Sequence, residues 1–219
     1  AYMGTVYTSQ DFGATWETDG IVQSSYGVAS SADGTKFVAT SQSYIYTTGT
    51  KVPTPTPTPS TNPTALTWTK LDPSCQCQSI ASSGNGQKLV AASFNGKIFT
   101  SSDFGATWLA RESVRSWSDV ASSFDGTKLV ATAEAGRIYT SSDSGVTWTP
   151  RESDRPWFGV ASSSDGTKLV AIVNPGQIYT STDSGASWTA RENTRQWRSV
   201  ASSTDGTKLV AVVRDGQIY

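Results

Sequence analysis

Histidine is absent from this 219-residue sequence, and cysteine and methionine are scarce, with two copies and one copy. The absence of histidine removes the commonest general base and the commonest transition-metal ligand, so we expect neither a metal site nor a cofactor. The 17 Lys and Arg residues nearly balance the 18 Asp and Glu residues, which gives no basic excess for nucleic acid. No apolar run approaches the roughly 18 residues of a membrane-spanning helix, so we expect no membrane span.

The two cysteines, Cys75 and Cys77, are separated by a single residue. A pair at this spacing cannot form the disulfide framework of a small secreted domain. The two residues either form a disulfide within a small ring or stay reduced, so the cysteine count leaves the redox compartment open. A Cys-x-Cys pair is also a weak metal signal, but no other ligand lies near in sequence, which favours a structural or oxidised pair.

Serine, threonine and glycine are abundant, and only 16% of the residues are charged. This composition is typical of an all-β extracellular domain rather than a helical cytosolic one. A repeat of about 40 residues covers most of the chain and is marked by Trp108, Trp148 and Trp188. A Val-Ala-Ser-Ser segment recurs in the same register, followed by an Asp-Gly or Asn-Gly pair and a lysine.

Each repeat is predicted to contain four short strands joined by three tight turns. The first strand is Val-Ala-Ser and the second is Lys-Leu-Val-Ala, and the Asp-Gly pair between them tolerates the positive φ of a two-residue hairpin. The third strand is Ile-Tyr-Thr, and the fourth ends on the repeated tryptophan. Four such antiparallel strands form one blade of a β-propeller. We therefore expect residues 1–219 to form a single all-β domain, a β-propeller of four-stranded antiparallel blades.

The strand count favours a five-bladed ring over a six-bladed one. Five complete sets of four strands run from about Thr8 to Tyr219, and a surplus strand at residues 4–7 precedes them. In a five-bladed ring, the fourth strand near the start of the chain would pair with the third strand at the end of the chain. This pairing leaves the surplus strand without a position. That strand would then pair with a neighbouring molecule or belong to a longer parent chain, and further sequence would complete six blades.

Residues 49–64 form a Pro/Thr-rich insertion within the domain. Proline has no N–H to donate to a sheet, so we expect an extended, polyproline-II-like segment of about 3.1 Å per residue. A Thr/Pro tract is also a candidate acceptor of O-linked glycans. The candidate residues are Thr54, Thr56, Thr58, Ser60 and Thr61.

The third turn of the repeat resembles the Asp-box, or BNR, repeat family, whose pattern is Ser-x-Asp-x-Gly-x-Thr/Ser-Trp. Four copies are intact, whereas the copy that ends at Trp68 has lost its Asp and Gly. The box residues are Asp11, Gly13, Trp16, Asp103, Gly105, Trp108, Asp143, Gly145, Trp148, Asp183, Gly185 and Trp188. In this family, which includes repeats of sialidases, sortilin-type receptors and photosystem II assembly factors, the box is a folding element. The resemblance therefore implies structural roles: Asp accepts backbone hydrogen bonds, Gly takes the left-handed conformation and Trp packs.

A second repeated feature is predicted as a loop between the fourth strand and the next blade. Its arginines and tryptophans are Arg111, Arg115, Trp117, Arg151, Arg155, Trp157, Arg191, Arg195 and Trp197. These residues could bind glycans, with the ring stacking on a sugar and three weak sites acting together. The favoured interpretation is that the tryptophans pack between blades and the charged residues form weak surface ion pairs. In the cysteine-containing unit, Cys75 and Cys77 take the places of Arg115 and Trp117.

The sequence favours a non-catalytic, secreted or cell-surface module with a structural, assembly or interaction role, such as a subunit of a surface glycoprotein or fibre. Its expected partner is itself or other repeats of the same chain, through strand addition at sheet edges. The alternative is a lectin-like propeller that binds glycans through the Arg/Trp loops. A sialidase-like glycosidase is less favoured, because catalysis needs different residues in different roles and the repeats are nearly identical.

Overall fold

The computed structural model describes residues 6–9, 13–18, 25–41, 43–48, 68–71 and 75–219. Asp11 and the Pro/Thr-rich insertion, with its candidate glycosylation sites, lie outside the described residues. All regular elements of the described part are β-strands, and none of it forms a helix long and apolar enough to cross a membrane. The strands are β1 (Tyr7–Thr8), β2 (Glu17–Thr18), β3 (Ser25–Ser30), β4 (Phe37–Ser41), β5 (Ile45–Thr48), β6 (Trp68–Leu71), β7 (Cys77–Ser82), β8 (Leu89–Ser93), β9 (Gly96–Ser101), β10 (Leu109–Arg115), β11 (Trp117–Ser122), β12 (Leu129–Ala133), β13 (Gly136–Ser141), β14 (Thr149–Arg155), β15 (Trp157–Ser162), β16 (Leu169–Val173), β17 (Gly176–Ser181), β18 (Thr189–Arg195), β19 (Trp197–Ser202) and β20 (Leu209–Val213).

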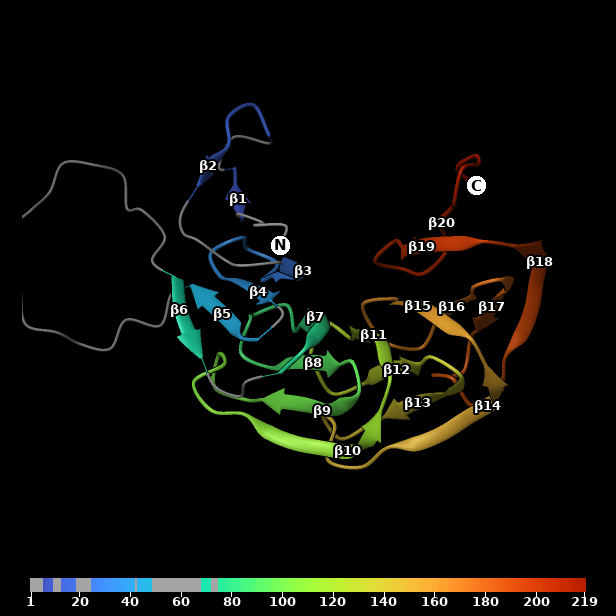
Figure 1. The fold of residues 1–219 in the computed structure, drawn as a ribbon, viewed down its shortest axis with the longest axis horizontal. Coiled ribbons are helices and arrows are strands. Elements are labelled where there is room, and N and C mark those ends of the chain that lie inside the picture. The colour runs from blue at the N-terminus through green and yellow to red at the C-terminus, as the bar shows by residue number, and fades with distance from the viewer. Residues whose placement is uncertain (1–5, 10–12, 19–24, 42, 49–67, 72–74) are drawn as a thin grey trace, which may run out of the picture.

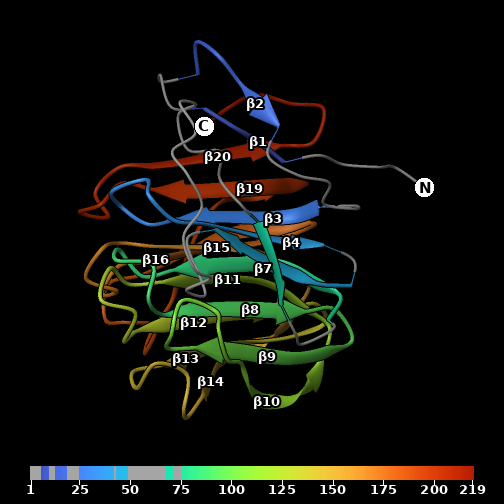
Figure 2. The same ribbon diagram turned by 90° about the vertical axis from the view of Figure 1, so that its left-hand side faces the viewer.

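The strands form four complete antiparallel blades of four strands each, in the orders β3-β4-β5-β6, β7-β8-β9-β10, β11-β12-β13-β14 and β15-β16-β17-β18. A two-stranded sheet stands at each end, β1-β2 before the first blade and β19-β20 after the last. Figure 1 shows the blades in an open arc, with the first strand of each blade on the inner side and the fourth on the outer side. Both end pairs lie at the open side of this arc (Figures 1 and 2).

Two expectations about the strands are corrected by this topology. The surplus strand, β1, pairs with β2 instead of being left without a partner, so each blade begins with the Val-Ala-Ser strand. The fourth strand starts after the box tryptophan rather than ending on it, as β10 does after Trp108. The reason is local: the Thr107 N–H donates to Asp103 Oδ1 at 2.8 Å, so the box turn extends to the residue before the tryptophan.

The hydrophobic core lies between successive blades. Val90 and Ile98 of one blade pack against Trp117, Val120 and Tyr139 of the next, and all five side chains are buried. The same arrangement returns 40 residues later and places Val130 and Ile138 against the following blade. Each blade therefore has two apolar faces, one for each neighbour, and its stability depends on the blades beside it.

The first turns of the blades are joined by a ladder of backbone hydrogen bonds. Ala32 donates to Gly84, which donates to Phe124, and the ladder continues through Ser164 to Thr204, with N–O distances of 2.7 to 2.8 Å. The ladder links the first turns of the four complete blades and the turn of the β19-β20 pair.

Candidate functional site

The Asp boxes are closed hydrogen-bonded turns. Asp143 accepts bonds from Ser141 Oγ at 2.8 Å and from the backbone N–H and hydroxyl of Thr147 at 2.9 and 2.6 Å. The bonds from Thr147 hold the pKa of Asp143 down at about 2. Hydrogen bonds from Ser187 likewise lower the pKa of Asp183 to about 2. These carboxylates are ionised near neutral pH and engaged within their own turns, which makes them poor general acids.

The arginine and tryptophan residues lie in strands, not in the loops that the sequence predicts. Arg111 and Arg115 lie in β10, and the equivalent pairs lie in β14 and β18. Trp117, Trp157 and Trp197 open β11, β15 and β19 and have 0% exposed area. A ring without exposed area cannot stack on a sugar, so the glycan-stacking interpretation is wrong for these three tryptophans.

The second arginine of each pair covers an aromatic stack. The guanidinium of Arg115 lies 4.8 Å from the centre of the Tyr139 ring, and Tyr139 meets Trp117 edge-on at 5.0 Å. Arg155 lies 5.0 Å from the Tyr179 ring in the next blade, and Arg195 lies 4.6 Å from Tyr219. These contacts are cation–π interactions between an arginine of one blade and an aromatic ring of the next.

The first arginine of each pair joins the third and fourth strands of its blade. Arg111, Arg151 and Arg191 donate from Nε to Thr100, Thr140 and Thr180, at 3.0 to 3.1 Å. The glutamate that follows each of them has a positive φ of 46 to 55°. This conformation is uncommon for a residue other than glycine, and here it accompanies a register shift in the outer strand.

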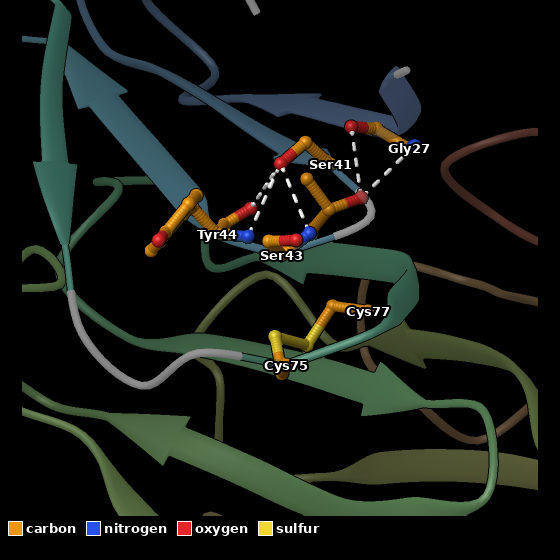
Figure 3. The surroundings of a disulfide bond; sticks show 7 residues. Gly27, Ser41, Ser43, Tyr44, Cys75 and Cys77 are labelled. Atoms are coloured by element: carbon orange, nitrogen blue, oxygen red, sulfur yellow. Dashed lines mark hydrogen bonds between the residues drawn. A yellow bond between two sulfur atoms is a disulfide. The ribbon is translucent and has the colours of Figure 1, made fainter. Parts of the chain in front are cut away.

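Cys75 and Cys77 form a disulfide at the interface between the first two blades. Cys77 is fully buried and, like Trp117 in the following blade, packs against the preceding blade, where it contacts the cluster of Val38 and Ile45. The Cys75 N–H donates to the Ser43 carbonyl at 3.2 Å. Figure 3 shows the disulfide next to the turn of Ser43 and Tyr44. The bridge therefore serves as a compact substitute for the tryptophan of the other blades.

Sequence reasoning missed a buried carboxylate, Asp119, on the inner strand β11. Its oxygens accept hydrogen bonds from Ser79 Oγ at 2.5 Å, from its neighbour Val120 N at 2.9 Å and from Val160 N at 2.9 Å. Burial raises its pKa, and the three donors oppose this effect. Asp119 thus links three inner strands, and the only signal in the sequence is a carboxylate at a position held by Ser or Gly in the other repeats.

The two ends of the arc carry exposed residues at positions that are buried between blades in the other repeats. Val28 of β3 is 67% exposed, although its equivalents Val120 and Val160 are each 5% exposed. At the other end Val210 of β20 is 43% exposed, although its equivalent Val170 is 1% exposed. Each of these exposed residues is a valine, as are these equivalents at the buried interfaces between blades.

The end pairs are complementary halves of one blade. Tyr7 of β1 pairs with Thr18 of β2 in the register in which Tyr139 pairs with Pro150, so β1 and β2 are third and fourth strands. Val6 packs on Ala39 and Tyr46 of the first blade, which matches the packing of Ile98 on the blade that follows it. The other pair, β19 and β20, supplies a first and a second strand.

The comparisons with known proteins agree with this repeat architecture. Residues 98–110, which include the second box, match the family model described as BNR-Asp box repeat. The chain folds as a β-propeller, and residues 98–110 of it match a BNR-Asp box repeat. No curated protein matches the sequence.

Solved structures resemble the propeller over most of its length. An ancestral GH74 enzyme aligns with 98% of this chain and 32% of its own, at 18% identity and a TM-score of 0.73. The GH74 enzyme of Niastella koreensis aligns with 90% of this chain and 31% of its own, at 18% identity and a TM-score of 0.60. YCF48 from Cyanidioschyzon merolae aligns with 89% of this chain and 65% of its own, at 13% identity and a TM-score of 0.62. The propeller thus spans about a third of the length of the two enzymes, and identities this low establish a shared fold and nothing finer.

Proposed function

We propose that this propeller is a non-catalytic assembly module that binds a second copy of itself head to tail. The observation that carries the proposal is the pair of uncovered end faces, one with Val28 and one with Val210. Val90 is equivalent to Val210, and Val120 is equivalent to Val28. Val90 and Val120 lie in one buried cluster at the interface between two complete blades. A second copy would therefore repeat an interface that this chain already forms between its own blades.

The half-blades support the same arrangement. The β19-β20 pair of one copy would lie beside the β1-β2 pair of the next, and together they would make a blade of four strands. In this blade β1 would take the position at which Ile218 now forms a bridge with Val212. Such a contact joins two different surfaces, so it generates rings or open chains rather than a symmetric dimer.

The state of the carboxylates supports a non-catalytic role. The box aspartates are engaged in their turns, and Asp119 is enclosed by three donors. Within the described residues no three His, Cys, Asp or Glu side chains are grouped so as to hold a metal ion. Disulfides are typical of oxidising compartments, which supports the proposal that the assembly forms outside the cell. The GH74 similarity reflects the fold alone and carries no activity to this chain.

Sedimentation velocity of the 219-residue chain across a wide concentration range tests the proposal. We expect mass to rise with concentration through a series of oligomers. The variants Val28→Lys and Val210→Lys each place a charge in one end face, and each variant alone should remain monomeric, because a buried unpaired charge is costly. An equimolar mixture should form a dimer that grows no further, because each variant keeps one intact end.

Val114→Lys is the matched control, since Val114 is exposed on the outer strand β10, away from both ends. It should assemble like the unmodified chain. A chain that stays monomeric at every concentration contradicts the proposal. Hydrogen exchange then shows why such a chain stays monomeric. Protected amides in β3 and β20 would indicate that the two ends close onto each other within one molecule, and unprotected amides would indicate free ends.

A further inference from the structure

A groove between the third and fourth complete blades is not used by the proposed assembly. It has a volume of about 190 Å³ and lies between the blades of β11–β14 and β15–β18. The cations Lys128 and Arg151 line it, together with hydroxyls that include Ser142, Thr147 and Ser184. Liquid water occupies about 30 Å³ per molecule, so the groove has room for a ligand of roughly six water volumes, the size of a single sugar ring.

The groove is wider than the equivalent space of the first interface, between the first two complete blades, where a larger residue stands at one position. In the first interface Phe104 occupies the position of Ser184, and the Lys36 ammonium lies 3.5 Å from its ring centre. The corresponding space there is about 10 Å³. In the second interface Lys88 Nζ donates to Ser144 Oγ at 3.1 Å.

Both cations of the groove keep free hydrogen-bonding capacity. Among the described residues Lys128 Nζ has no hydrogen-bond partner. Its positive charge is one of the smaller causes that lower the pKa of the nearby Asp165 carboxyl. The Asp165 oxygens are already occupied by Ser163 and Thr167. Arg151 uses Nε for Thr140, at 3.0 Å, which leaves its terminal nitrogens for a ligand.

Asp183 also lines the groove, and it partly offsets the positive charge. Its oxygens accept bonds from Ser181 Oγ at 2.8 Å and from the Ser187 amide and hydroxyl at 2.9 and 2.5 Å. Among the residues that line the groove, two cations accompany one engaged carboxylate, and the other polar groups are mostly hydroxyls. This combination suits a ligand that has one negative charge and several hydroxyl groups.

We propose that this groove binds an acidic monosaccharide. The sugar carboxylate would lie between Lys128 and the terminal nitrogens of Arg151, and its hydroxyls would bond Ser142, Thr147 and Ser184. The site differs from the glycan site that the sequence suggests, because no tryptophan stacking is involved and because it lies between two blades. It also stands independently of head-to-tail assembly, since neither end face contributes to it.

Titration with glucuronate, followed by NMR chemical shifts of the intact chain, tests the proposal, with glucose as the neutral probe. We expect glucuronate to bind at least about tenfold more tightly than glucose, because a charge-assisted hydrogen bond is about twice as strong as a neutral one. Lys128→Met should weaken glucuronate binding by about tenfold and leave glucose unaffected. Lys168→Met is its control, because the Lys168 ammonium already donates to the Asp205 carbonyl at 2.9 Å.

Ser184→Phe gives an independent readout, because it copies the residue that fills the first interface. Ser184 and Phe104 have nearly the same φ, 58 and 60°, so the backbone accepts the change. This variant should abolish glucuronate binding, whereas Ser144→Phe, the same change one interface earlier, should not. Undetectable binding of glucuronate, equal binding of glucose and glucuronate, or unchanged binding by Ser184→Phe would each overturn the proposal. If Ser184→Phe fails to fold, the comparison of Lys128→Met with Lys168→Met decides.

Discussion

Replacing Trp157 by alanine should remove much of the stability of the propeller. The side chain is fully buried between two blades, meets Tyr179 edge-on at 5.0 Å and donates from Nε1 to the Ser153 carbonyl at 3.2 Å. Truncation of a buried tryptophan to alanine costs about 3–5 kcal/mol, and the lost aromatic pair adds about 1 kcal/mol. Since a domain is stable by only about 5–15 kcal/mol, the variant should be marginal at room temperature.

Urea denaturation, monitored by far-UV circular dichroism, measures this loss as a lower midpoint. Trp16→Ala is the control, because Trp16 is 61% exposed and its loss should cost less than about 1 kcal/mol. Phenylalanine variants isolate the indole hydrogen bond. The Trp117 Nε1 is buried without a partner, so Trp157→Phe should cost about 1 kcal/mol more than Trp117→Phe. A Trp157→Ala variant as stable as Trp16→Ala would refute the burial argument and would return this residue to consideration as a ligand-binding group.

Three further predictions concern the carboxylates and the box turn. Asp119→Ala should lower the free energy of unfolding by about 2–3 kcal/mol, because the buried Val160 N–H loses its acceptor. Urea denaturation measures the change, and an unchanged free energy would mean that the carboxylate is dispensable for stability. Gly145→Ala should cost about 1–3 kcal/mol, because its φ is +84° and a Cβ would lie 2.7 Å from Thr100 Cγ2. A melting temperature equal to that of the unmodified chain would contradict this. Stability should fall as pH drops from about 4 to about 2, because the pKa of Asp143, like that of most turn aspartates, is lowered from 3.8 to about 2 in the folded chain and its contribution is lost on protonation. Asp119 has a raised pKa, so its protonation favours the folded chain as the pH falls toward 3.8 and changes little below that value. Thermal melting should therefore show the same loss between pH 4 and pH 2 in Asp119→Ala as in the unmodified chain.

The repeated hydrogen bonds and turns could be read from the sequence because they depend on residues close together in the chain. The box of Asp143 is closed by Ser141 and Thr147, within four residues of it. The four-strand repeat and the all-β propeller follow from the same local patterns of turn residues and alternating apolar positions. Both ends of the fourth strand were predicted wrongly, because the strand starts after the box tryptophan and runs through the predicted Arg/Trp loop, as β10 does to Arg115.

Other features depend on groups that only folding brings together, and these the sequence alone could not decide. Asp119 binds Ser79 and Val160, which lie 40 and 41 residues away in neighbouring blades. The burial of Trp157 and the exposure of Val28 and Val210 depend on whether another blade covers them, because the residue types are the same in covered and uncovered repeats. The groove at Lys128 is wider than the equivalent space of the first interface, where Phe104 stands at the position of Ser184. The sequence by itself determined the repeating blade and its turns, since their contacts are local, and the tertiary structure decided which blade surfaces remain available, since that depends on the neighbours of each blade.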